Sequence, residues 1–183
     1  TKVPHRVGKK SFSNPPYISA KSVLIADINT RRILYKKNSS LVLAPASTTK
    51  LMTGLVSLDL FSLDQRVSSM EKCLSLEGHK LHLHSGEKIS IQDLLHALLI
   101  SSSNDAACIL ANAATTEEEF VWLMNQKASE LGMHHTNFTN PIGFDSREFS
   151  HYSTAEDLYI LSLATKFNPT LSEICGKVEY SFY

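Results

Sequence analysis

The sequence predicts a mixed α/β (α+β) fold in which a helical subdomain packs beside an antiparallel sheet. Residues 23–28 and 33–35 are β-branched, apolar runs separated by a short polar segment, which is the pattern of a β-hairpin within residues 21–37. After position 47, apolar residues recur at helical spacing in several segments. The sheet looks incomplete, because stable sheets use three or more strands and only the tail "GKVEYSFY" could begin another one.

The chain begins with a predicted arm. Residues 1–16 are basic, contain serines and end in Asn-Pro-Pro, which is typical of a mobile N-terminal arm. The length of the chain suffices for a sizeable core and fits one large domain or two small ones. Along the chain, the first helix begins near Ser47, and residues 64–89 are expected to form loops and short strands.

Three capping boxes mark the starts of further helices. In such a box, a Ser or Thr side chain accepts the N–H of the residue three positions on, and an acidic side chain there returns the bond. The boxes begin at Ser90, Thr116 and Ser153, and Gly132 is the expected end of the second of these helices. The polar segment "SSSN" at 101–104 separates the first helix from another apolar helical run.

Composition narrows the class of protein. The 183 residues carry 18 basic and 18 acidic side chains, and this zero net charge argues against a nucleic-acid-binding protein. The three cysteines, Cys73, Cys108 and Cys175, are widely spaced and predict neither a disulfide framework nor a zinc site, so they do not indicate a compartment. Cys108 is expected to be a small, buried apolar residue.

Ser47 and Lys50 are the first candidates for catalysis. The segment "PASTTKLMTG" places the serine three residues before the lysine at a helix start, so that both side chains share one face. A serine needs a base to act as a nucleophile, and lysine becomes a base when burial lowers its pKa. Free N–H groups at a helix start also favour an oxyanion. The alternative is that Ser47 is a helix cap and Lys50 a solvated side chain.

Ser102 and Asn104 are the second pair of candidates. They lie in "SSSN", the polar break between two apolar helical runs. In a catalytic role, Ser102 would relay a proton between Lys50 and a leaving group, and Asn104 would hold Lys50 or a substrate amide. Alternatively, both residues are helix caps, for which Ser and Asn are well suited.

The order of these segments resembles that of a known family. "SVLIADINTRRILYKKNSS" is similar to its opening hairpin, "LAPASTTKLMTGLVSLD" to its nucleophile segment, and "HSGEKISIQDLLHALLISSSNDAACILA" to the segment through its second motif. "FVWLMNQKASELGMHHTNFTNPIGFD" and "HYSTAEDLYILS" resemble the family's segments after that motif. Over about residues 17–183 the chain thus resembles the serine D-alanyl-D-alanine carboxypeptidases. These are low-molecular-mass penicillin-binding proteins with a β-lactamase/transpeptidase-like fold and S-x-x-K, S-x-N and K-T-G elements.

The resemblance implies an activity and a site. Ser47 would be the acylated nucleophile and Lys50 its general base. Ser102 would be catalytic and Asn104 substrate-binding, in a transpeptidase-like catalytic domain at 17–183. The substrate would be a peptidoglycan stem peptide ending in D-Ala-D-Ala, and β-lactam antibiotics would acylate the same serine. No metal or cofactor is implied. The implied location is the cell envelope, with membrane association only through regions not in this chain.

The sequence also departs from the family pattern. The K-T-G motif is absent, because Gly176 and Lys177 are followed by valine. This absence and the incomplete sheet lead us to expect a fragment that has little carboxypeptidase activity alone. Ser103 stands where glycine is frequent in the family, and Ile142 where histidine is common. Neither change removes a catalytic side chain.

Other side chains and functions give further alternatives. His82 and His84 would share one face of a strand, but no third metal ligand is evident, so solvated histidines are favoured over a metal site. Trp122 and Met124 are expected in the core. A β-lactamase would need a deacylating glutamate in an E-x-x-L-N pattern, which the sequence lacks. A noncatalytic penicillin-binding sensor and a structural protein whose serines are caps are the remaining alternatives.

Overall fold

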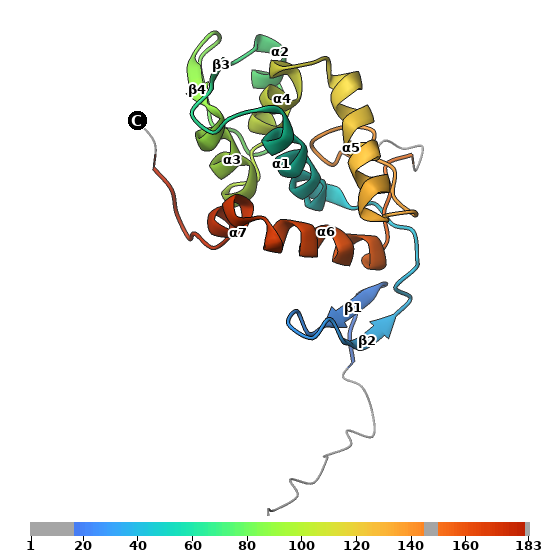
Figure 1. Ribbon diagram of the computed structural model, residues 1–183. Coiled ribbons are helices and arrows are strands. Elements are labelled where there is room, and N and C mark those ends of the chain that lie inside the picture. Colours follow the sequence, from blue (N-terminus) through green and yellow to red (C-terminus); the bar gives the residue numbers. More distant parts are fainter. Residues whose placement is uncertain (1–16, 145–149, 182–183) are drawn as a thin grey trace, which may run out of the picture.

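The computed structural model describes residues 17–144 and 150–181, so the predicted arm at 1–16 lies outside the described residues. In chain order the elements are β1 (Val23–Ala26), β2 (Ile33–Lys37), the 3₁₀ turn η1 (Ala46–Thr48), α1 (Thr49–Leu60), β3 (Arg66–Ser68), α2 (Glu71–Leu74), β4 (Lys88–Ser90), α3 (Ile91–Ile100), α4 (Asn104–Ala113), α5 (Glu117–Leu131), α6 (Ala155–Phe167) and α7 (Pro169–Cys175). Figure 1 shows a helical body with α6 and α7 along one side and the β1–β2 hairpin beyond α6.

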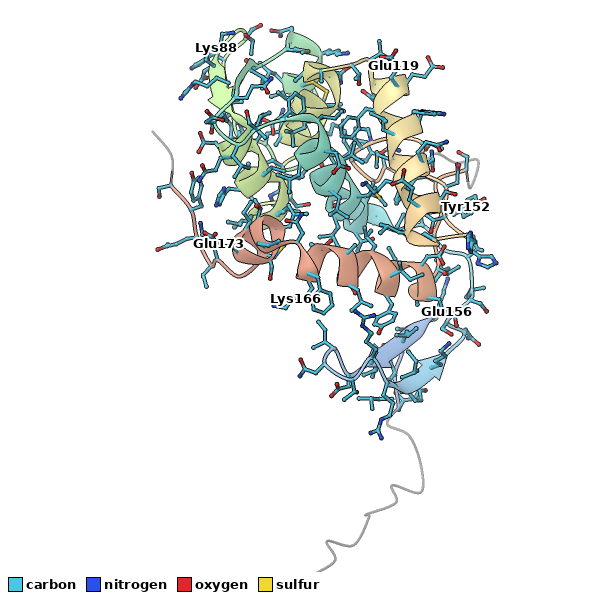
Figure 2. All side chains as sticks on the ribbon, viewed as in Figure 1. Lys88, Glu119, Tyr152, Glu156, Lys166 and Glu173 are labelled. Carbon is cyan, nitrogen blue, oxygen red and sulfur yellow. A yellow bond between two sulfur atoms is a disulfide. The ribbon has the colours of Figure 1, made fainter. Side chains whose placement is uncertain are left out.

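The hairpin is confirmed. Strands β1 and β2 pair antiparallel, and Asp27 closes the turn because its Oδ1 accepts the backbone N–H groups of Asn29 and Thr30 at 3.1 and 2.7 Å. Strand β1 packs against α6. At the start of α6, Glu156 points toward the hairpin (Figure 2), and its Oε1 lies 2.6 Å from Lys36 Nζ. The mixed helix and sheet fold predicted from the sequence is therefore present.

Helix α1 lies at the centre of the helical body and packs against α3, α4, α5 and α6 (Figure 1). Its side chains join two buried clusters, one shared with α3, α4 and α7 and the other with α5 and α6. Burying one large apolar side chain contributes roughly 1.5–3 kcal/mol, so α1 is held firmly on both sides. The largest fully buried side chains are Phe120, Phe138, Met52, Ile91, Leu94, Leu95, Leu98, Ile109, Leu110, Met124, Met133 and Leu161.

The predicted helix boundaries are confirmed with one shift. Ser90 and Thr116 cap α3 and α5, and Gly132, with a φ of 85°, ends α5. Helix α6, however, is capped by Thr154 rather than Ser153. The reason is that the backbone of Ser153 forms an isolated β-bridge with the chain leading into η1, so the helix begins one residue later than predicted.

The expected burial of Trp122 is wrong, whereas that of Met124 is confirmed. Trp122 is 59% exposed, while Phe120 and Met124 are fully buried. At 3.6 residues per turn, a position two residues away lies about 200° around the helix axis. Because Phe120 and Met124 both face the core, Trp122 between them faces solvent.

Two predicted strand features are also wrong. The described part of the tail, residues 176–181, forms no strand; it follows helix α7, which Asn168 caps and which begins at Pro169. In the segment 64–89, β3 and β4 pair antiparallel as expected. His82 and His84, however, lie in the loop before β4 rather than on a strand face.

Cys73 in α2 and Cys108 in α4 form a disulfide, with a Cα–Cα distance of 5.4 Å. The prediction that the cysteines form no disulfide is therefore wrong. Cys108 is buried as expected, but it is bonded to its partner. The odd number of cysteines reflects this pair together with one free thiol at Cys175. Spacing in the sequence could not reveal a pair that only the packing of α2 on α4 brings together.

Candidate active site

Ser47 lies in the turn η1 directly before α1, and its side chain is exposed. The turn has an unusual backbone, because Ala46 has a φ of 49°, a left-handed value that most residues avoid. Thr48 Oγ1 donates to the carbonyl of Pro45 at 2.6 Å and supports the turn. The serine thus stands at the N-terminal end of a helix, where backbone N–H groups are free to donate.

Lys50 is 3% exposed, and its Nζ lies 3.1 Å from Ser47 Oγ and 3.0 Å from the carbonyl oxygen of Ile142. Burial lowers the pKa of Lys50 from 10.5 to about 8, because a charged amine is disfavoured away from water. At neutral pH this raises the fraction of neutral amine by roughly 300-fold. A neutral Lys50 can donate one N–H to Ile142 and direct its lone pair at the serine.

The turn that presents the Ile142 carbonyl is built by Asn140 and Gly143. Asn140 Oδ1 accepts the backbone N–H groups of Ile142, Gly143 and Phe144 at 3.1, 2.7 and 3.1 Å. Gly143 has a φ of 93°, and a Cβ there would lie 2.0 Å from the carbonyl oxygen of Ala46. Only glycine therefore permits this approach to the residue before Ser47. The contact with Lys50 uses the backbone of Ile142, so it does not depend on the side chain at that position.

His151 is a buried residue of this region to which sequence reasoning gave no role. Its Nε2 lies 2.8 Å from Thr49 Oγ1, and its Nδ1 accepts the N–H of Thr139 at 3.0 Å. The imidazole therefore joins the first turn of α1 to the segment that leads into the Ile142 turn. The sequence around it, "HYSTAEDL", indicated only the start of α6.

Ser102 and Asn104 lie at the junction of α3 and α4, both of which pack against α1. Ser102 is half-buried with a φ of 56°. Asn104 is 7% exposed; its Nδ2 donates to the carbonyl of Glu77 at 2.7 Å, and its backbone N–H donates to the carbonyl of His79 at 2.8 Å. Among the described residues, no hydrogen bond joins Lys50 to either Ser102 or Asn104.

Residues 17–144 and 150–181 contain no group of three or more His, Cys, Asp or Glu side chains that could hold a metal ion. The groups that meet at the candidate site are the amine of Lys50, whose pKa is lowered by burial, the hydroxyl of Ser47 and the backbone N–H groups at the helix start. This set suits acyl transfer by a serine nucleophile.

The fold is that of the penicillin-binding proteins and DD-transpeptidases. The structure matches the D-alanyl-D-alanine carboxypeptidase of Mycobacterium tuberculosis H37Rv with a TM-score of 0.85 and 32% identity, covering 91% of this chain and 64% of the other. Penicillin-binding protein D2 of Listeria monocytogenes, in its ampicillin-bound form, matches with a TM-score of 0.78 and 28% identity, covering 90% of this chain and 69% of the other.

The sequence identifies the family within this fold. A family model described as D-alanyl-D-alanine carboxypeptidase matches residues 9–182, so the chain belongs to that family. D-alanyl-D-alanine carboxypeptidase DacF of Bacillus subtilis (strain 168) is 36% identical over 166 residues, which cover 87% of this chain and 42% of the relative. The chain therefore spans less than half the length of that relative. The predicted resemblance and fold are both confirmed.

Proposed function

We propose that this protein acts as a serine-type D-alanyl-D-alanine carboxypeptidase, with Ser47 as nucleophile, Lys50 as general base, Ser102 as proton relay and Asn104 as a substrate-binding residue. One observation supports this most strongly. A buried lysine with a pKa of about 8 lies 3.1 Å from an exposed serine hydroxyl at a helix start. Membership of the D-alanyl-D-alanine carboxypeptidase family supports peptidoglycan stem peptides that end in D-Ala-D-Ala as the proposed substrate class.

The reaction runs through an ester on Ser47. Neutral Lys50 accepts the hydroxyl proton while Oγ attacks the carbonyl carbon between the two D-alanines, and the Ser47 N–H donates to the oxyanion. Ser102 passes a proton from the Lys50 ammonium to the leaving nitrogen, so D-Ala departs as an amine. Asn104 holds an amide of the substrate. Water then attacks the ester carbonyl carbon while Lys50 accepts its proton, and Lys50 passes this proton to Ser47 Oγ as the ester C–O bond breaks, which regenerates the serine.

A β-lactam would acylate Ser47 in the same way, because its amide carbonyl takes the place of the scissile bond; the Listeria relative is described in an ampicillin-bound form. We place the protein outside the cytoplasmic membrane, where peptidoglycan lies. The Cys73–Cys108 disulfide supports this location, since disulfides persist in oxidising compartments. None of the helices in the described part of the chain is long and apolar enough to cross a membrane.

Intact mass after incubation with a penicillin tests the nucleophile. We expect a gain of one ligand mass in the natural protein and none in Ser47→Ala. An adduct that persists in the variant, or no adduct in either protein, would contradict the assignment of Ser47. Release of D-Ala from a peptide ending in D-Ala-D-Ala, lost in Ser47→Ala, would show a carboxypeptidase rather than a noncatalytic sensor, and rapid turnover of penicillin would indicate a β-lactamase.

A further inference from the structure

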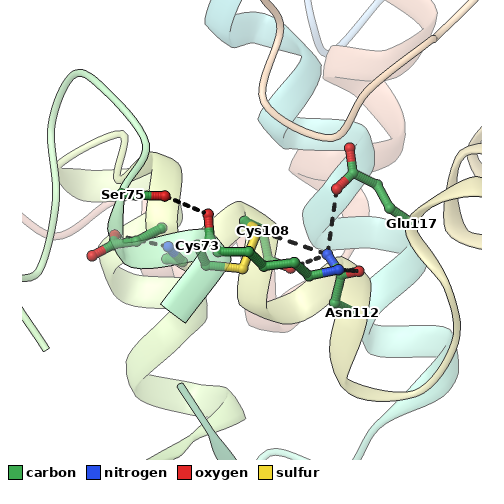
Figure 3. The surroundings of a disulfide bond; sticks show 8 residues. Cys73, Ser75, Cys108, Asn112 and Glu117 are labelled. Atoms are coloured by element: carbon green, nitrogen blue, oxygen red, sulfur yellow. Dashed lines mark hydrogen bonds between the residues drawn. A yellow bond between two sulfur atoms is a disulfide. The ribbon is translucent and has the colours of Figure 1, made fainter. Parts of the chain in front are cut away.

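The Cys73–Cys108 disulfide lies directly before the segment that contacts Asn104, and Figure 3 shows it beside Ser75, the first residue of that segment. It joins α2, which has four residues, to α4. Both cysteines are buried, whereas Cys175 is exposed and free. Residues 75–84 leave α2 directly after the disulfide and form no helix or strand. We refer to residues 75–84 as the α2 loop.

The α2 loop is hydrogen-bonded to the first two residues of α4. The carbonyls of Glu77 and His79 accept the side-chain and backbone N–H groups of Asn104, at 2.7 and 2.8 Å. Two positions further on, the N–H of Leu81 donates to Asp105 Oδ2 at 2.8 Å. Asp105 is fully buried, so its carboxylate depends on such donors. These three bonds place the backbone of the loop directly over the start of α4.

Gly78 couples the path of the loop to the orientation of Asn104. Its φ is 94°, and a Cβ at this position would lie 2.5 Å from Asn104 Nδ2. The loop backbone therefore lies against the carboxamide itself. A loop that moved away would leave the Asn104 amide without its Glu77 partner, and a side chain free to rotate would no longer present its oxygen in one direction.

Three kinds of contact hold the α2 loop on the body: the disulfide, the hydrogen bonds to α4, and the packing of Leu76, Leu81 and Leu83 against the core. Glu77, Gly78 and His79 are exposed. An exposed hydrogen bond of 2.6 Å from Lys72 Nζ to Asn112 Oδ1 also links α2 to α4. The disulfide spans 35 positions of sequence, and a cross-link of that length removes much of the freedom of the chain it closes.

We propose that the Cys73–Cys108 disulfide is a positioning device for Asn104: it holds the α2 loop on the start of α4 and thereby fixes the carboxamide of Asn104. The consequence for catalysis rests on the proposed function, in which Asn104 binds substrate. Reduction by a dithiol breaks the Cys73–Cys108 disulfide and should release the α2 loop. The dithiol supplies two electrons and two protons, Cys73 and Cys108 become thiols, and the dithiol becomes a disulfide.

Residue-resolved hydrogen exchange tests the positioning without requiring activity. The Leu81 amide, which donates to Asp105, and the Asn104 amide, which donates to His79, report directly on the docked loop. In reduced natural protein, with two additional alkylatable thiols verified by mass, we expect both amides to exchange at least about 10-fold faster. The Phe120 amide in α5 should change less than about two-fold.

The double variant Cys73→Ala/Cys108→Ala should reproduce the effect, and Cys175→Ala is the matched control that keeps the disulfide. If the double variant does not fold, the reduced natural protein still tests the proposal, because it keeps both cysteine side chains. Unchanged exchange at Leu81 and Asn104 after verified reduction would overturn the proposal. Equal acceleration at Phe120 would also overturn it, because the disulfide would then stabilise the whole domain rather than position Asn104.

Penicillin acylation supplies the catalytic readout. Reduction should slow adduct formation several-fold, whereas Cys175→Ala without reductant should form the adduct as fast as the oxidised natural protein. If the loop amides respond and acylation does not, the disulfide positions the loop but Asn104 has no part in acylation. If the oxidised protein forms no adduct, the proposed function fails, while the exchange measurement still decides whether the disulfide positions the loop.

Discussion

Lys50 and Asn104 are both polar, nearly buried side chains of the candidate site, yet different parts of the chain hold them. Lys50 is 3% exposed and has its two partners in η1 and in the turn at 140–143. Asn104 is 7% exposed, and its partners are backbone carbonyls of the α2 loop. The turn that contacts Lys50 is closed by three hydrogen bonds to Asn140, whereas a disulfide anchors the α2 loop.

The two halves of the candidate site should therefore differ in how much motion they tolerate. The Ser47–Lys50 half rests on α1, which is packed on both sides, and on a turn that meets backbone atoms at close range. The Asn104 half depends on the exposed α2 loop, where Gly78 approaches only the end of the Asn104 side chain. A disturbance of the first half should therefore remove reactivity, while the same disturbance of the second half should only reduce it.

Gly143→Ala should have the largest effect. The added Cβ would lie 2.0 Å from the Ala46 carbonyl oxygen, and the φ of 93° is itself strained for alanine. Because backbone must move, we expect acylation by penicillin to slow by about 100-fold or more, and the free energy of unfolding to fall by about 2–3 kcal/mol. Stopped-flow acylation and urea unfolding measure the two quantities.

Gly132→Ala is the matched control for this prediction. Gly132 has a φ of 85°, but the nearest atom to an added Cβ there is His134 Nε2 at 4.0 Å. Alanine at this position, the end of α5, would therefore be strained by the positive φ without a close backbone contact. If both variants slow acylation equally, the close approach of Gly143 to Ala46 does not organise the nucleophile.

The pH dependence of acylation tests whether Lys50 is the general base. Its pKa of about 8 means that the reactive neutral amine falls tenfold for each unit of pH below that value. The acylation rate should therefore be about 50-fold lower at pH 6 than at pH 8 and should level off above pH 9. A flat profile between pH 6 and 8, measured with a penicillin whose own charge is constant there, would exclude Lys50 as the base.

The same shift should appear in stability with a defined sign. Between pH 8 and 10.5 the unfolded chain binds a proton at Lys50 that the folded chain has released, so the contribution of this group to the free energy of unfolding rises with pH. Lys50→Met should remove this rise and also abolish the pH dependence of acylation. A rise that persists in the variant would show that other groups cause it.

The sequence predicted the local parts of the site and missed the distant ones. Ser47 and Lys50 were found because they lie three residues apart at a helix start, and Ser102 and Asn104 because a polar break interrupts two apolar helices. The contact of Lys50 with Ile142 and that of Asn104 with Glu77 were not predicted, since the accepting atoms are backbone carbonyls, which no side-chain pattern encodes. The disulfide escaped for a similar reason: only the packing of α2 on α4 brings its cysteines together.

The fold shows the same division between local and distant information. Capping residues and glycine predicted where α3 and α5 begin and α5 ends, because these signals act within one helical turn. Helix α6 started one residue late because a β-bridge to a distant segment holds Ser153 extended. Helix α7 was missed although Asn168 and Pro169 form a regular helix start.

Gly78→Ala should have the smallest effect and tests the comparison most directly. The added Cβ would lie 2.5 Å from Asn104 Nδ2, but that atom is the end of a side chain that can rotate away. We therefore expect acylation to slow only about three- to tenfold, with the disulfide intact and faster hydrogen exchange at the Leu81 amide.

Gly86→Ala is the matched control, because Gly86 has a φ of 80° and no atom within 4 Å of an added Cβ. A loss of acylation as large as that of Gly143→Ala would show that the Asn104 half is as rigidly required as the Ser47–Lys50 half, and the contrast between the two halves would not hold.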